Sequence, residues 1–125
     1  MKKINISIKR VYAPPDEKDG TRILVDRLWP RGLTRERAKV DLWLKEIAPS
    51  TNLRKWFGHE PDKWTGFKER YIRELNINKE SVSILKERLK KGPVTLVYGA
   101  KDELHNDAVC IKEWLSHSSL EQSLP

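Results

Sequence analysis

The clearest strand of the chain is Val94-Thr95-Leu96-Val97-Tyr98, which follows Gly92-Pro93 and precedes Gly99. Successive residues are apolar or β-branched, so both faces of this strand are expected to be buried. Ile23-Leu24-Val25 is a second run of the same kind. Strands with two apolar faces need covering layers on both sides, and such strands are usually parallel to a neighbour. The sequence therefore predicts an α/β fold: a compact three-layer single domain with a small, at least partly parallel sheet flanked by helices.

Helical periodicity fills much of the chain between and after these strands. Trp64, Phe67, Tyr71 and Leu75 recur at helical spacing behind Pro61, which predicts a core-facing helix over about 61–75. Further helices are predicted over about 34–38, from position 50 or 51 to Gly58, between positions 78 and 92, and after position 102. Alternating isoleucines predict a strand over 4–8. Residues 38–48 fit both helical and strand spacing, and the sequence leaves them open.

Composition bounds the class of protein. The 125 residues are 38% hydrophobic and 34% charged, which fits one domain, 1–125, with an ordered core over about 3–116 and a polar tail over 117–125. No apolar stretch is long enough to span a bilayer, and the start lacks the apolar core of a signal peptide. The single cysteine, Cys110, excludes a disulfide scaffold. We therefore expect a cytoplasmic protein with no membrane partner.

The charge is concentrated in the first half of the chain. Residues 1–60 contain 14 Lys or Arg against 8 Asp or Glu, and the whole chain carries a formal net charge of +7. Such a surface favours an anionic partner, and it also fits a surface that is merely well solvated.

The segment after Val25 is the first candidate site, because ligands of open α/β sheets bind beyond the carboxyl ends of parallel strands. Arg27 and Arg31 could grip a phosphate or carboxylate, and Trp29 offers a flat face for a base or sugar. Gly32 permits close backbone approach, and Asp26 could act as a general base. We expect Arg31 to hold the anion and Arg27 to be the more structural arginine. A structural Asp–Arg pair beside a core tryptophan is the competing interpretation.

The segment after the strand 94–98 is the second candidate site. Lys101 could bind an anion, and His105 and Asn106 are expected at the start of a helix, where a neutral imidazole could exchange protons. Asp102 could share in proton transfer, although its position also predicts a helix N-cap. If the two strands are parallel neighbours, both candidate segments meet at one edge of the sheet. The predicted catalytic residues are therefore Asp26, Asp102 and His105.

A third candidate lies in Trp56-Phe57-Gly58-His59, where Trp56 and His59 could line a pocket. Core aromatic residues followed by a helix-ending glycine and an exposed histidine explain this segment equally well. Three separated histidines and one cysteine give no zinc pattern, and no nucleotide-binding glycine motif is present. The sequence predicts neither a metal nor a cofactor.

Three long motifs resemble the YeaO-like family of small bacterial proteins of unknown function. They are the segments 25–32, 48–59 and 98–106, and the resemblance extends from about Lys9 to Leu115. The resemblance implies no established activity. Longer relatives carry a Cys-His-Arg-type segment after the equivalent last strand, whereas this chain has Asp102-Glu103-Leu104-His105-Asn106. A cysteine-based mechanism is therefore not carried over to this chain.

These observations favour a cytosolic domain that binds or acts on a small anionic ligand, phosphorylated or nucleotide-like. One alternative is a nucleic-acid-binding or regulatory module that uses the basic first half, although no helix-turn-helix with a basic recognition helix is evident. The other is a partner-binding protein without chemistry. The sequence leaves open whether the protein is an enzyme.

Overall fold

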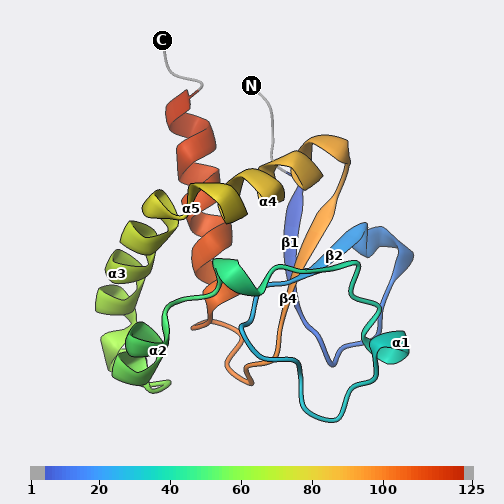
Figure 1. The fold of residues 1–125 in the computed structure, drawn as a ribbon, viewed down its shortest axis with the longest axis horizontal. Helices are drawn as coiled ribbons and strands as arrows, with labels where there is room; N and C mark the ends of the chain where they lie inside the picture. Colours follow the sequence, from blue (N-terminus) through green and yellow to red (C-terminus); the bar gives the residue numbers. More distant parts are fainter. Residues whose placement is uncertain (1–4, 123–125) are drawn as a thin grey trace.

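The computed structural model describes residues 5–122 and their side chains up to position 117. Ile4, the first residue of the predicted strand 4–8, lies outside the described residues. Four strands and five α-helices are joined by short 3-10 turns (Figure 1). The strands are β1 (Ile6–Arg10), β2 (Thr21–Leu24), β3 (Leu42–Trp43) and β4 (Val94–Tyr98). The helices are α1 (Arg35–Ala38), α2 (Thr51–Phe57), α3 (Trp64–Ile77), α4 (Lys79–Lys91) and α5 (Asp107–Gln122).

The sheet has the strand order β1-β4-β2-β3, and every neighbouring pair is parallel. The expectation of an α/β domain with a small parallel sheet is confirmed. β4 and β2 are the two central strands, and Leu24 is paired with Val97. Because the strands are parallel and in register, their carboxyl ends and the segments that follow them lie at the same edge.

The two faces of the sheet are covered unequally. Ile23, Leu96 and Tyr98 face the larger core, which they form with residues of α2, α3, α4 and α5. Leu24 and Val97 face a smaller cluster that is closed by Ala38 of α1, by Trp29 of the loop after β2 and by Trp43 of β3. Figure 1 shows the helices α2, α3 and α5 on one side of the strands and the single turn of α1 on the other. The predicted three layers are therefore one thick helical layer, the sheet and a thin outer layer.

The predicted stripe on α3 faces the core. Phe67, Tyr71 and Leu75 are buried, and Trp64 is half-buried against the same cluster. Local sequence signals also place α2. The Ser50 hydroxyl accepts a hydrogen bond from the Leu53 N–H, and Gly58 ends the helix in the left-handed conformation with a φ of 53°.

The segment that the sequence left open is neither a helix nor a long strand. Only β3, a two-residue edge strand, and a short 3-10 turn over Lys45–Ile47 are regular within it. Val40 packs into the smaller cluster, whereas Leu44 and Ile47 belong to the larger core. The segment thus wraps around the edge of the sheet and contributes to both sides.

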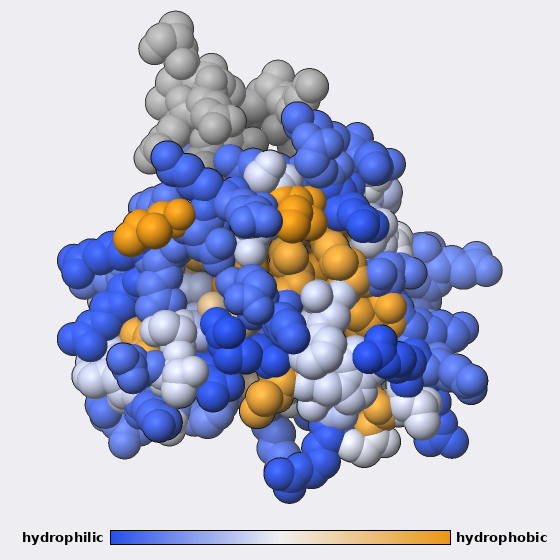
Figure 2. All heavy atoms as spheres, in the orientation of Figure 1, coloured by the Kyte–Doolittle hydropathy of each residue, from blue (hydrophilic) through white to orange (hydrophobic). Residues whose placement is uncertain are grey.

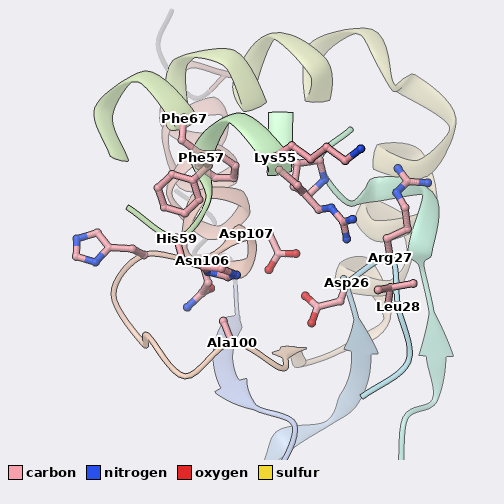
Figure 3. A pocket seen from close by; sticks show the side chains of 13 residues that line it. Asp26, Arg27, Leu28, Lys55, Phe57, His59, Phe67, Ala100, Asn106 and Asp107 are labelled. Carbon is pink, nitrogen blue, oxygen red and sulfur yellow. The ribbon is translucent and has the colours of Figure 1, made fainter. Parts of the chain in front are cut away.

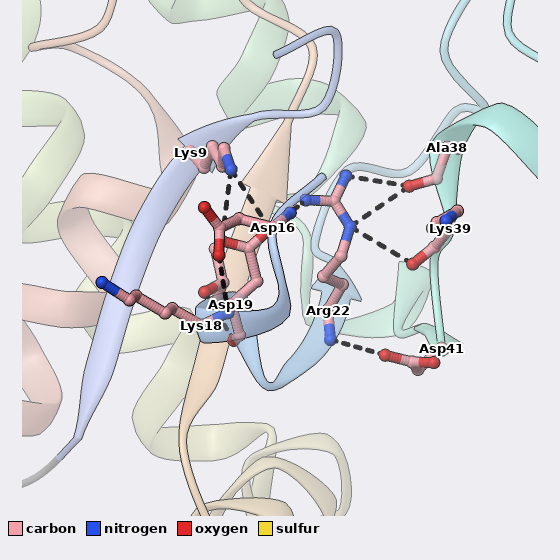
Figure 4. Close-up of polar contacts among 9 residues, drawn as sticks. Lys9, Asp16, Lys18, Asp19, Arg22, Ala38, Lys39 and Asp41 are labelled. Atoms are coloured by element: carbon pink, nitrogen blue, oxygen red, sulfur yellow. Dashed lines mark hydrogen bonds and ion pairs between the residues drawn. The ribbon is translucent and has the colours of Figure 1, made fainter. Parts of the chain in front are cut away.

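A buried ion pair ties the outer layer to the sheet (Figure 4). Arg22 of β2, only 3% exposed, donates to the Asp19 carboxylate at 2.8 Å and to the carbonyls of Ala38 and Lys39. Burial alone would raise the pKa of Asp19, but hydrogen bonds from the Asp16 N–H, Arg22 and Lys9 outweigh burial and lower that pKa. These contacts give Arg22 and Asp19 a structural role.

The surface is mostly polar. Figure 2 shows a largely hydrophilic face, with apolar side chains gathered in a limited area near its centre. Among the described residues, no helix has both the length and the apolar character needed to cross a membrane.

Candidate functional site

A pocket of about 460 Å³ lies beyond the carboxyl ends of β2 and β4 (Figure 3). Asp26 and Arg27 follow β2, and Ala100, His105 and Asn106 follow β4, so the ends of the two central strands meet in this pocket. The rest of the wall comes from the loop after β2, from α2 and the residues next to it, from α3 and from the start of α5. These residues are Leu28, Pro49, Arg54, Lys55, Phe57, His59, Phe67 and Asp107. Its volume is within the range typical of small-ligand sites.

Two carboxyl groups face each other in this pocket. Figure 3 shows the side chains of Asp26 and Asp107 pointing toward one another, and they are hydrogen-bonded. Burial raises the pKa of Asp107 well above its ordinary value, and the charge and hydrogen bond of Asp26 raise it further. Simultaneous ionisation of the two carboxyl groups is therefore disfavoured.

The fold fixes Asp26 from several sides. Its carboxylate accepts a hydrogen bond from the Gly99 N–H at 2.8 Å, and its carbonyl accepts one from the Trp43 indole at 2.8 Å. The first contact joins the ends of β2 and β4. Asp26 is thus held in one orientation relative to the pocket.

Arg27 and Arg54 supply cationic groups with unused hydrogen-bonding capacity. The Nε atoms of both guanidinium groups are buried, yet neither has a hydrogen-bond partner within the described part of the chain. One Nη of Arg27 lies 3.4 Å from the Ala48 carbonyl. Buried donors of this kind are normally satisfied, so these two unpaired Nε atoms call for an explanation. Lys55, the residue after Arg54 on α2, is exposed and adds an ammonium group.

His105 is positioned by Asp102. The His105 Nδ1 lies 2.8 Å from the Asp102 carboxylate, and the Trp64 ring packs edge-on against the imidazole at 5.2 Å. The hydrogen bond with His105 is the largest cause of a lowered pKa of Asp102. Because Asp102 does not line the pocket, it can act there only through His105.

The predicted helix cap at Asp102 is wrong. α5 begins at Asp107, and the side-chain Oδ1 of Asn106 accepts the hydrogen bond from the Val109 N–H that an N-cap provides. Asp102 instead accepts from the N–H groups of Leu104 and His105 and stabilises the preceding turn. His105 therefore lies in the loop before α5, not in its first turn.

The structure brings five of the predicted site residues together: Asp26, Arg27, His59, His105 and Asn106. The remaining predicted residues do not line this pocket. Trp29 donates to the Leu33 carbonyl, Arg31 is exposed on the turn beyond it, and Lys101 is exposed. Trp56 packs under the Arg70 guanidinium at 3.9 Å. Gly32 has a φ of 79°, with open space where a side chain would start, so its conformation and not a close contact explains the glycine.

Sequence reasoning missed Asp107, Arg54 and Lys55. Asp107 directly follows the predicted His105-Asn106 pair, so a shift of one residue would have included it. Arg54 and Lys55 directly precede Trp56, which the sequence predicted as a pocket residue. No local signal shows that this face of α2 approaches the ends of the strands. Across the residues that the structure describes, no group of three or more His, Cys, Asp or Glu is placed to hold a metal ion.

A family model described as the inactive DUF488-N3 subclade matches residues 5–124. The chain belongs to this YeaO-like family. It is 46% identical over 112 residues to the uncharacterized protein YeaO of Escherichia coli strain K12, covering 90% of this chain and 97% of that protein.

More distant relatives come from mycobacteria. This YeaO-like chain is 31% identical over 116 residues to the uncharacterized protein Rv3073c of Mycobacterium tuberculosis, and equally to the uncharacterized protein Mb3100c of Mycobacterium bovis. Each match covers 93% of this chain and 98% of the relative. No solved structure matches the chain significantly.

Proposed function

We propose that this YeaO-like protein binds a small anionic ligand, phosphorylated or nucleotide-like, in the pocket beyond β2 and β4. The observation that carries the proposal is the pair of guanidinium groups, Arg27 and Arg54, whose buried Nε atoms are unpaired within residues 5–117. Guanidinium groups bind phosphate and carboxylate groups through two parallel hydrogen bonds.

The charge of the pocket supports an anion. Arg27, Arg54 and Lys55 bring three positive charges, whereas Asp26 and Asp107 bring at most two negative charges, and the raised pKa of Asp107 favours fewer. The excess positive charge attracts an anion, and the apolar wall strengthens the attraction by excluding water.

Binding without turnover is the form of this proposal that we favour. The family model that matches this chain is described as an inactive subclade. That Asp26, Asp102 and His105 transfer protons remains a proposal. A turnover assay with a ligand that binds the pocket would test it. We also propose a cytoplasmic location, because Cys110 is a buried free thiol, which suits a reducing compartment.

A melting experiment with inorganic phosphate tests the binding proposal. A ligand at 100 times its Kd adds roughly 2.7 kcal/mol to the stability of the folded state, which raises Tm by several degrees. We expect phosphate to raise the Tm of the wild-type protein, and to raise it much less in Arg54→Gln and Arg27→Gln. These substitutions remove the charge while they keep a polar side chain.

Arg73→Gln is the matched control, since Arg73 is exposed on α3 and lies outside the pocket. Its response to phosphate should equal that of the wild type. Arg31→Gln separates the pocket from the turn at 29–32. An unchanged response in Arg54→Gln together with a lost response in Arg31→Gln would move the site to that turn and refute the proposal.

A further inference from the structure

The Asp26–Asp107 pair gives the pocket a second kind of recognition, different from that of its arginines. The two carboxyl groups face each other in the pocket, and with a proton on Asp107 they present a hydrogen-bond donor and several acceptor lone pairs side by side. One oxygen of Asp26 is already engaged by the Gly99 N–H, and one oxygen of Asp107 by the Ala108 N–H. The remaining oxygens are suited to neighbouring hydroxyl groups, each of which both donates and accepts.

The opposite part of the pocket is apolar and aromatic. Phe57 and Phe67 border it from the core, where they are 6% and 2% exposed and their ring centroids lie 4.5 Å apart. Leu28, Pro49 and Ala100 add further apolar wall. A sugar ring has polar hydroxyl edges and faces of C–H groups, so it matches a wall that is carboxyl on one side and aromatic on the other. A cavity of about 460 Å³ accommodates a sugar of five or six carbons that carries a phosphate.

We infer that the ligand of this pocket is a phosphorylated sugar, free or as part of a nucleotide, whose phosphate lies on Arg27 and Arg54 and whose ring hydroxyls bind Asp26 and Asp107. This inference rests on the proposed function, because the arginines must hold the anion. It adds the class of the ligand, since inorganic phosphate or a simple carboxylate would leave the carboxyl pair unused.

Titration calorimetry with four probes tests the inference: inorganic phosphate, ribose 5-phosphate, 2-deoxyribose 5-phosphate and adenosine 5′-monophosphate. Hydrogen bonds to a charged group are worth enough to change affinity about tenfold each. We expect ribose 5-phosphate to bind at least about tenfold more tightly than inorganic phosphate. Comparison with 2-deoxyribose 5-phosphate measures the contribution of one hydroxyl, and adenosine 5′-monophosphate separates a nucleotide from a free sugar phosphate.

Two isosteric variants test the roles of the carboxyl groups. Asp26→Asn keeps an oxygen for the Gly99 N–H and removes the carboxylate, so the preference for ribose 5-phosphate over phosphate should fall about tenfold while phosphate still binds. Asp107→Asn keeps one oxygen, which the Ala108 N–H occupies, and turns the other group into a pure donor, so the preference for ribose 5-phosphate should also fall. Asp62→Asn is the control, because Asp62 is exposed and outside the pocket. Circular dichroism confirms that each variant is folded.

The possible outcomes are distinguishable. Binding of phosphate and ribose 5-phosphate with equal affinity, or a preference that Asp26→Asn leaves intact, overturns the sugar inference and leaves the anion site standing. Binding of none of the four probes overturns this inference and removes the support for the anion site as well. A preference for ribose 5-phosphate that is lost in Asp26→Asn and kept in Asp62→Asn supports the inference.

Discussion

Burial and one neighbouring carboxyl group together govern the ionisation of Asp107. The residue starts α5, where the helix dipole would favour a negative charge, yet burial and Asp26 raise its pKa well above the ordinary value. The neighbouring carboxylate and the loss of water together outweigh the helix end. Asp107 therefore binds its proton more tightly in the folded protein than in the unfolded chain.

This proton makes stability depend on pH. For a carboxyl with a raised pKa, the stabilisation by the proton is complete below the ordinary pKa of about 3.9 and is lost as pH rises through the raised pKa. Asp107→Asn has no such proton to lose. We expect the stability of the variant relative to wild type to increase from pH 5 to pH 8 by on the order of 1 kcal/mol. Urea unfolding of both proteins across this range measures the difference.

The comparison between the two proteins also isolates Asp107 from its surroundings. The other titratable groups of the pocket, Asp26, Lys55, His59 and His105, are present in both proteins. Stability curves that run parallel from pH 5 to pH 8 would show that Asp107 titrates normally. The raised pKa of Asp107 would then be refuted.

Arg22 and Lys9 both bind Asp19, but they differ in burial. The Arg22 side chain is 4% exposed and the Lys9 side chain 24%. Arg22→Met leaves the buried Asp19 carboxylate and two backbone carbonyls without their partner, so we expect it to cost about 3–5 kcal/mol. Lys9→Met should cost about 1 kcal/mol or less. Chemical denaturation measures both, and equal losses would contradict a special role for Arg22.

At the scale of elements, two glycines with positive φ differ in the space around them, so they distinguish the cost of backbone strain from the cost of a steric collision. Gly20 and Gly32 have φ values of 65° and 79°. A Cβ on Gly20 would collide with the carbonyl of Pro93, which directly precedes β4, whereas a Cβ on Gly32 would meet open space. The loop before β2 and the loop before β4 therefore pack backbone to backbone.

We expect Gly32→Ala to cost about 1 kcal/mol from backbone strain alone. Gly20→Ala should cost roughly 3 kcal/mol, because strain and collision add. Thermal and urea unfolding of the two variants provide the comparison. A Gly20→Ala variant as stable as Gly32→Ala would mean that the loops separate at little cost.

The regular elements could be predicted because their signals are local. β4 and the stripe on α3 follow from residue periodicity, and α2 follows from Ser50 at its start and Gly58 at its end. Residues 38–48 could not be assigned, because Val40 and Leu44 pack on different sides of the sheet and no single period describes such a segment. The start of α5 was misplaced because Asp102 and Asn106 both have cap chemistry, and only the three-dimensional turn shows which one caps the helix.

The candidate site could be predicted only where strand order decides it. Asp26 and His105 lie in one pocket because they follow two strands that pair in parallel. Arg54 comes from a helix far along the chain, and nothing in its local sequence shows how that helix crosses the strand ends. The pairing of Asp26 with Asp107 likewise depends on tertiary structure.

At the scale of the whole molecule, the net charge of +7 does not by itself make a nucleic-acid surface. The cations of the pocket line a half-open pocket of about 460 Å³, and a small ligand fits a space of this size better than a duplex does. We expect no saturable binding of a 20-base-pair DNA or a single-stranded RNA of similar length at 0.15 M salt below about 10 μM protein. Fluorescence anisotropy at several salt concentrations measures this. Tight binding that weakens steeply with salt would favour the nucleic-acid alternative.

The proposed function depends on where an anion binds. A phosphate titration followed by two-dimensional ¹H–¹⁵N NMR tests this most directly, because each backbone amide reports its own surroundings. We predict saturable shifts with a common Kd at residues 26–28, 54–59 and 99–107, and much smaller shifts over 31–45, where Arg31 and α1 lie. Saturable shifts centred on 31–45, or no saturable shifts at any phosphate concentration, would contradict an anion site at the ends of β2 and β4.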